Sequence, residues 1–253
     1  MLIIYSQSLF AQIDESEIKI VTKAYYYYEF SKYETYDNIY DDTEDRSSED
    51  SILRDVVEIY YPNIQTPDSK LNTFINDAIL KNVGVDIENS VSNKMDRSYD
   101  SLEEMPSVTY TTFTINYISS LFISLTINQN GEACCGASGA SHHSIPLTFD
   151  LVNKKIICFE DVIRKKQYEK AYNILVDQYT KNTSDEIQLE KYIDQGYLQT
   201  LLKTPVVVFA DKMIVYQNVS YGGKSVDITI AFEYEKYADL FNKEFLMKIN
   251  KKN

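Results

Sequence analysis

The sequence predicts an α+β protein: an antiparallel β-meander, in one sheet or two, with helices packed on one side and with one or two lobes. Three observations predict this class. Polar and apolar residues alternate through 107–129, as they do in half-buried strands. Apolar residues recur every three or four positions in 70–82 and again after Glu160, as on one face of a helix. Strand patterns return in 206–232, so strands and helices are segregated along the chain.

The amino-terminal part of the chain divides into two segments. Residues 1–12 are apolar and end beside the small residue Ala11, which is typical of a signal-peptide remnant, although an ordinary first strand has the same pattern. Residues 13–50 are expected to form a strand, Glu17 to Phe30, and then an acidic loop. Six of the ten residues 41–50 are acidic, but they lack the spacing of a calcium-binding loop. We therefore expect a solvated loop.

The main domain is expected to occupy residues 51–250 as one compact unit, because the chain contains no internal repeat and no linker rich in Pro or Gly. Its first helix is predicted over Lys70 to Asn82, with Ser69 as the N-cap. The other predicted helices begin at Asp161 and near Ser184, and a last one spans Tyr237 to Met247. The predicted strands are 56–61, 107–116, 119–129, 144–151, 156–159, 206–209, 213–217 and 226–232.

The charge of the chain argues against two classes of partner. The formal net charge is −13 and the isoelectric point is near 4.6. Nucleic acid needs a basic surface, so we expect no nucleic-acid binding. Docking on an anionic membrane is disfavoured for the same reason, and no stretch is long and apolar enough to span a bilayer. A cationic partner would be attracted.

The most unusual stretch of the sequence is the expected hairpin loop from Cys134 to His143. It contains both histidines, His142 and His143, and two of the three cysteines, which are donors that zinc and copper sites use. Adjacent residues of an extended chain point to opposite faces, so neither the cysteine pair nor the histidine pair converges readily on one metal ion. The third cysteine is Cys158, and three cysteines predict no disulfide framework.

We assign no catalytic residue, no metal ligand and no cofactor from the sequence. Ser and Cys residues near the histidines lack the strand-turn-helix elbow of a nucleophilic site, and no glycine loop of a phosphate site is present. A metal-dependent or cell-wall hydrolytic enzyme that uses the loop from Cys134 to His143 is the alternative. A second turn, Tyr221-Gly222-Gly223, joins two late strands, and Tyr216 and Tyr221 could offer a rigid aromatic surface there.

The order of these parts resembles a known domain over roughly residues 50–250. The strand end Tyr60-Tyr61-Pro62 and the helix Leu71-Asn72-Thr73-Phe74-Ile75-Asn76 come first. Then follow Ile123 to Ile127, the loop Gly139-Ala140-Ser141-His142, and the motifs Thr148-Phe149-Asp150-Leu151 and Ile157-Cys158-Phe159-Glu160-Asp161-Val162-Ile163. In this order they are similar to the extracytoplasmic domain of RsiV-type anti-sigma factors and the N-terminal domain of PdaC-type peptidoglycan deacetylases.

The resemblance implies an α+β domain of largely unknown function outside the cytoplasm. In the anti-sigma relatives the domain binds lysozyme, which is strongly cationic, and in the deacetylases it is an accessory domain. We therefore expect a secreted or periplasmic, non-catalytic binding domain that recognises a cell-envelope ligand, such as cell-wall glycan, or a cationic protein such as lysozyme. The candidate binding residues are Gly139, His142, His143, Tyr216 and Tyr221.

Overall fold

A computed structural model describes residues 13–32, 51–83, 107–132, 141–182, 197–221 and 224–250. The elements are β1 (Lys19–Lys32), β2 (Ser51–Gln65), α1 (Ser69–Val83), β3 (Ser107–Ile118), β4 (Phe122–Glu132), β5 (Ser141–Asp150), β6 (Lys155–Ile156), α2 (Phe159–Val162), α3 (Tyr168–Asn182), α4 (Tyr197–Lys203), β7 (Val207–Val208), β8 (Lys212–Tyr221), β9 (Lys224–Glu233) and α5 (Lys243–Ile249), with short 3₁₀ turns at Glu15–Glu17 and Lys165–Gln167. The predicted α+β class is confirmed.

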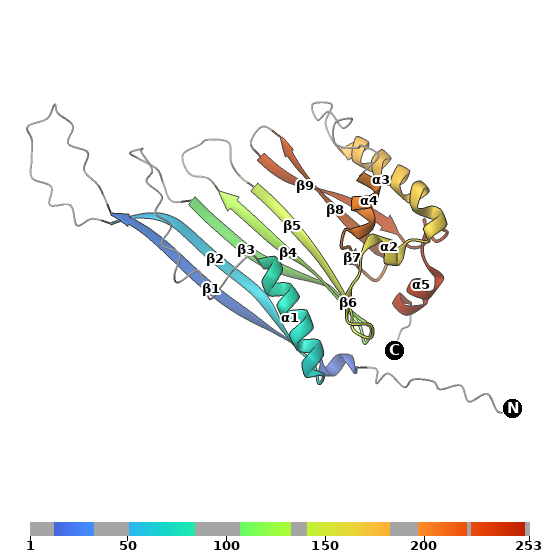
Figure 1. The fold of residues 1–253 in the computed structure, drawn as a ribbon, viewed down its shortest axis with the longest axis horizontal. Coiled ribbons are helices and arrows are strands. Elements are labelled where there is room, and N and C mark those ends of the chain that lie inside the picture. The colour runs from blue at the N-terminus through green and yellow to red at the C-terminus, as the bar shows by residue number, and fades with distance from the viewer. Residues whose placement is uncertain are drawn as a thin grey trace, which may run out of the picture.

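The strands form two sheet parts that meet along a short seam (Figure 1). The first part has the strand order β1-β2-β3-β4-β5, with β6 on β5, and the second is antiparallel with the order β9-β8-β7. The predicted meander holds from β3 to β6. β2 and β3 instead run parallel, because α1 forms the crossover between them. β5 joins β9 through a single residue pair, Ser141 and Ser225.

Helix α1 covers one face of the first sheet. Its buried residues Leu71, Ile75 and Ile79 pack in one cluster with the odd-numbered residues of β4, such as Leu125. Odd and even residues of a strand point to opposite faces, so this cluster leaves the even-numbered side chains on the other face. The predicted helix is confirmed, but its cap is wrong: the Asp68 carboxylate, not Ser69, accepts the first N–H groups of α1.

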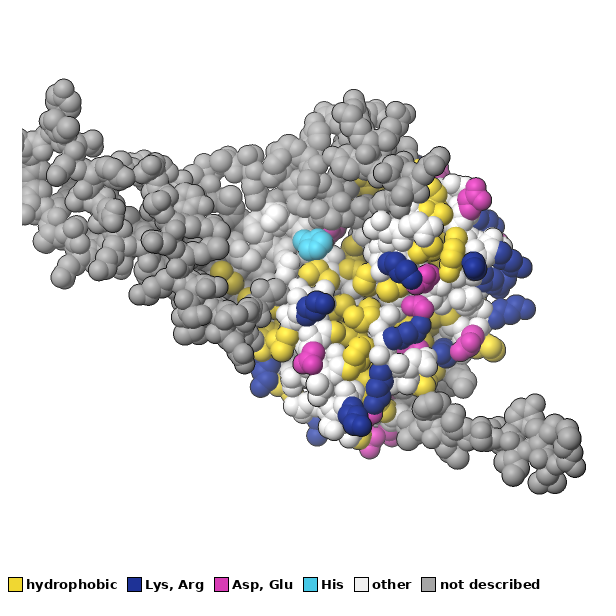
Figure 2. Space-filling view, in the orientation of Figure 1, with side chains coloured by type: hydrophobic (Ala, Val, Ile, Leu, Met, Phe, Trp, Pro, Cys, Tyr) yellow, Lys and Arg dark blue, Asp and Glu magenta, His cyan; other side chains and the backbone are white. Residues whose placement is uncertain are grey.

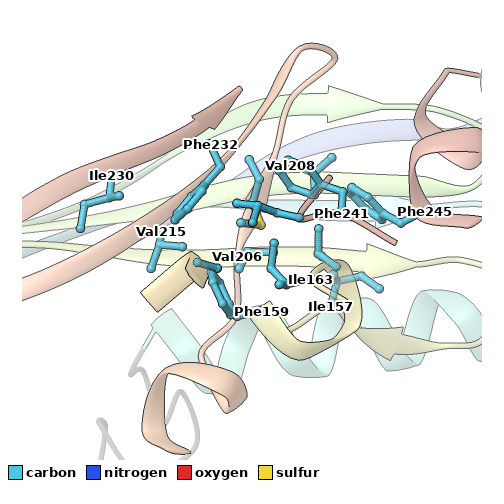
Figure 3. Packing of buried hydrophobic residues seen from close by; sticks show 14 of the residues in the cluster. Ile157, Phe159, Ile163, Val206, Val208, Val215, Ile230, Phe232, Phe241 and Phe245 are labelled. Atoms are coloured by element: carbon cyan, nitrogen blue, oxygen red, sulfur yellow. The ribbon is translucent and has the colours of Figure 1, made fainter. Parts of the chain in front are cut away.

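A second hydrophobic cluster joins the later helices to β8 and β9. Buried side chains of the two strands, including Val215 and Phe232, meet Phe159 of α2 and Phe245 of α5 (Figure 3). Phe122 of β4 also belongs to this cluster, although its neighbour Ile123 belongs to the α1 cluster. β4 therefore separates the two cores, with one on each face.

Several predicted boundaries are wrong for local physical reasons. β2 continues past Pro62 to Gln65. The pairing of β2 with β3 ends at Ile59, so Pro62 has a neighbouring strand, β1, on one side only, and a strand with a free side tolerates proline. The helix predicted from Asp161 is split into α2 and α3, and Asp161 lies inside α2, where its carboxylate accepts from the Cys158 N–H. The last helix begins at Lys243, after turns.

Some predictions fall on residues outside the described ranges: the signal-peptide remnant 1–12, the acidic loop within 33–50 and the helix start near Ser184. Among the helices that are described, none has the length and apolar character needed to cross a membrane.

Candidate functional site

The two hairpins that the sequence singles out end side by side in the fold. The pairing of Ser141 with Ser225 brings the start of β5 next to the start of β9. Tyr221 ends β8 and pairs with Lys224, so its backbone lies at the same end of the sheet as His142 and His143. Gly139, Cys134 and Cys135 lie outside the described residues. We call this end of the strands, residues 141–144 and 224–227 with Tyr221, the hairpin edge.

His142 is an even-numbered residue of β5, so its side chain lies on the face of the sheet that is turned away from α1. It stands opposite Asn130 of β4, whose side-chain oxygen contacts the imidazole Nδ1. The imidazole Nε2 is 3.4 Å from the Ser144 hydroxyl, two residues further along the same strand. His142 is exposed, whereas Ser144 is only 4% exposed. The order of hydroxyl, imidazole and amide is that of a nucleophilic site, but a buried hydroxyl at this distance is not presented to a substrate.

His143 points to the opposite face and meets an acid that the sequence patterns did not single out. Its Nδ1 lies 3.7 Å from the Asp227 carboxylate of β9, which is 3% exposed, while the imidazole is 48% exposed. The other carboxylate oxygen accepts the backbone N–H of Ser144. Asp227 therefore links the two sheet parts directly beside the pair of serines.

The two imidazoles have separate partners, as expected for neighbours on a strand. No group of three or more potential metal ligands occurs among the described residues. Asp227 was missed because only the tertiary pairing of β5 with β9 brings it next to His143, 84 positions earlier in the chain. A strand pattern gives the face of a residue, but it does not identify a partner on a distant strand.

Tyr216 does not lie with the other candidates. It is half-buried and pairs with Thr229, five residues along β8 from Tyr221, which corresponds to about 17 Å of extended chain. Cys158 is also remote from the hairpin edge; it is a half-buried free thiol in front of α2. Burial, together with the nearby Asp161 and Glu160 carboxylates, raises the pKa of this thiol.

The even-numbered side of β3, β4 and β5 carries an uncharged surface that we call the polar face. Across the strands Tyr110 stands opposite Asn130, and Thr112 stands opposite Asn128. Tyr110, Thr112, Thr114 and His142 are exposed, and the two asparagines are half-buried. The polar face consists of Tyr110, Thr112, Thr114, Asn128, Asn130 and His142.

The two aspartates of the motifs quoted above, Asp150 and Asp161, line a cavity of about 350 Å³ at the far end of β5. Asp150 accepts the N–H groups of Val152 and Asn153 and holds the turn after β5. Asp161 pairs with Lys155 at 2.5 Å. Both carboxylates thus have local structural partners, and the cavity wall carries charges of both signs.

Comparison with known proteins shows a similarity in fold. No family model and no curated protein matches the sequence. A crystal structure of a member of the DUF3298 family from Bacteroides fragilis is similar, with a TM-score of 0.55 and 14% identity over 93% of this chain and 99% of that chain. A DUF3298 family protein from Pseudomonas aeruginosa has a TM-score of 0.46 and 10% identity over 89% of this chain and 95% of that chain. The first of these shares the fold, and the family it represents is a domain of unknown function.

Proposed function

We propose that the chain is an extracytoplasmic, non-catalytic binding domain that recognises a strongly cationic protein such as lysozyme. The observation that carries the proposal is the charge: the formal net charge is −13, and six acids lie in the ten residues 41–50 between β1 and β2. Opposite charges steer association, so such a chain favours a basic partner. The resemblance to RsiV-type domains supports the same partner, and the apolar residues 1–12 support export.

The hairpin edge is the proposed contact surface. The strands of two hairpins end there next to each other and carry His142, His143 and Tyr221, while Gly139 precedes β5 outside the described residues. Figure 2 shows a histidine on the molecular surface close to hydrophobic side chains, and over the helical part the acidic and basic side chains are interspersed. Histidine and tyrosine combine an apolar ring with a polar tip, which suits a protein interface. Tyr216 is not part of this proposed contact surface, because it lies five residues away from Tyr221 along β8.

The test is a binding measurement of the full chain against immobilised hen lysozyme at low and high salt. The acidic variant replaces Asp41, Asp42, Glu44 and Asp45 by their amides. We expect it to bind more slowly and at least about tenfold more weakly at low salt, with little difference at high salt, because screening removes the attraction.

The control changes the net charge equally at exposed positions elsewhere, with the amides of Asp77, Glu169, Glu233 and Glu235. We expect it to retain most of the affinity. If lysozyme does not bind at low salt, the proposed partner is wrong. If both variants weaken binding equally, only the total charge matters and the segment 41–50 has no special role.

A further inference from the structure

The polar face differs in composition from the rest of the chain. Asp, Glu, Lys and Arg make up 25% of the sequence, yet none of the six residues of the polar face is of these types. Asn116, Thr126 and Ser144, which adjoin it on the same strands, are also uncharged. Two acids border the face: Glu58 of β2 pairs with Tyr110, and Glu132 of β4, two residues beyond Asn130, pairs with Val108. A charged ligand would lose hydration on this surface without gaining an opposite charge, so the surface fits a neutral ligand.

Hydrogen bonds hold the side chains of this face in place. The Asn128 amide donates to the Thr114 hydroxyl at 3.5 Å and accepts from the Ser144 hydroxyl at 3.4 Å. The Ser144 hydroxyl reaches His142, which in turn contacts Asn130. The network therefore crosses β3, β4 and β5. Side chains that are already ordered lose less conformational entropy when a ligand binds.

The chemistry of the face favours a polyhydroxylated ligand over a peptide. Threonine hydroxyls and asparagine amides each donate and accept hydrogen bonds, which matches the hydroxyl groups of sugars. Tyr110 is 37% exposed and offers a ring on which an apolar sugar face can stack. A peptide added as a strand needs a free sheet edge, whereas β4 is paired on both sides. The face is about 10 Å wide across three strands and about 14 Å long from Tyr110 to Thr114.

We propose that the polar face binds a neutral polysaccharide chain, laid flat across β3, β4 and β5. This surface and ligand differ from the proposed protein contact surface and partner, and His142 is the one residue that belongs to both the polar face and the hairpin edge. The variants that test the glycan site therefore leave His142 unchanged.

The experiment is a calorimetric titration of the full chain with soluble neutral oligosaccharides: β-linked N-acetylglucosamine, glucose, xylose and mannose chains. We expect at least one of them to bind with an affinity that salt hardly changes, since no ion pair forms. Tyr110→Thr introduces a β-branched residue that suits a strand and removes the ring, so we expect about a tenfold loss of affinity. Tyr110→Phe keeps the ring and should retain most of the affinity.

A second variant protects the test against loss of folding at Tyr110. Thr112→Glu places a charge in the middle of the face and should weaken glycan binding at least about fivefold. Thr229→Glu makes the same change at an exposed strand position of β9 and should leave the affinity within about twofold.

Three outcomes would overturn the proposal: none of the neutral oligosaccharides binds, Thr112→Glu binds as well as the unaltered chain, or binding depends strongly on salt. A dimer in sedimentation that Thr112→Glu dissociates would instead assign the face to a second copy of the chain. Lysozyme binding is measured separately on the same variants, so failure of one proposal is distinguishable from failure of the other.

Discussion

The hydroxyl groups of Ser124 and Thr148 lie 2.8 Å apart, fully buried between β4 and β5, and together they hold the short strand β7. The Val208 N–H donates to Ser124 Oγ at 2.9 Å, and Thr148 Oγ1 donates to the Val206 carbonyl at 2.7 Å. Since Thr148 uses its one proton on Val206, Ser124 must donate to Thr148. A continuous chain of hydrogen bonds therefore ties the second sheet part to the even-numbered face of the first.

Removal of either hydroxyl should destabilise the fold. Ser124→Ala leaves the buried N–H of Val208 without this acceptor, and Thr148→Val preserves shape while removing the donor to Val206. We expect each to lower the free energy of unfolding by about 1–3 kcal/mol, measured by urea denaturation. The double variant should cost less than the sum, because the two hydroxyls belong to one chain of bonds.

The matched control is Thr229→Val on the exposed side of β9. It should change the free energy of unfolding by no more than about 0.5 kcal/mol. If Thr148→Val and Thr229→Val changed the free energy of unfolding equally, the hydrogen bonds of the buried hydroxyls would not stabilise the attachment of β7.

Asp227 should matter for stability more than the histidine it faces. Asp227→Ala removes the acceptor of the Ser144 N–H at the seam between the sheets, and we expect a loss of about 1–3 kcal/mol. Asp227→Asn keeps an acceptor oxygen and should cost less. His143→Gln removes a half-exposed imidazole that lies 3.7 Å from the carboxylate and should cost about 0–1 kcal/mol. The three values come from denaturant titrations, and a His143→Gln loss as large as that of Asp227→Ala would contradict this order.

Local patterns in the sequence predicted most elements because their causes are local. The spacing of Leu71, Ile75 and Ile79 gave α1, and the alternation through Ile123, Leu125 and Ile127 gave β4 together with its buried face. The predicted strands 144–151 and 156–159 leave only four residues between them for a tight turn, and Lys154 has a positive φ of 50° there.

The features that escaped prediction depend on contacts between distant segments. The parallel pairing of β2 with β3 follows from the crossover of α1, which no alternation pattern reveals. Asp227 and Ser144 become neighbours only through the seam between β5 and β9. The polar face requires the register of three strands, since Tyr110 and His142 both stand opposite Asn130.

The cap of α1 should make stability depend on pH at the acidic end. Asp68 accepts from the helix N–H groups and pairs with Lys154 Nζ at 2.7 Å. The hydrogen bond from Lys154, followed by that from the Leu71 N–H, lowers the pKa of this carboxyl below its ordinary value of 3.8. Its folded-state pKa is depressed, so its contribution is present above the unfolded pKa and is lost as the pH falls through the folded pKa.

Asp68→Asn keeps the capping oxygen and removes the charge. We expect a lower melting temperature than that of the unaltered chain at neutral pH, and a difference that shrinks as the pH falls below the ordinary pKa of an aspartate. Thermal melts followed by circular dichroism at several pH values measure this difference. Asp77→Asn, an exposed change further along α1, is the control, and a difference that stayed constant with pH would exclude the charge as the cause.

Replacement of Tyr234 by phenylalanine should stabilise the fold. Its hydroxyl is buried and has no hydrogen-bond partner among the described residues, and burial raises the pKa of this phenol strongly. The ring itself packs against Phe241 and Phe245, with centroids 5.0 and 5.9 Å away, and Tyr234→Phe keeps these contacts.

Removal of an unsatisfied buried hydroxyl relieves its desolvation penalty, so we expect Tyr234→Phe to raise the free energy of unfolding by about 1 kcal/mol or more. Tyr117→Phe is the matched comparison, because its hydroxyl donates to the Ile249 carbonyl at 3.3 Å. That change should lower the free energy of unfolding by about 0.5–1.5 kcal/mol. Urea titrations of the two variants side by side test the sign of each effect, and a loss of stability in Tyr234→Phe would mean that a bound water satisfies the hydroxyl.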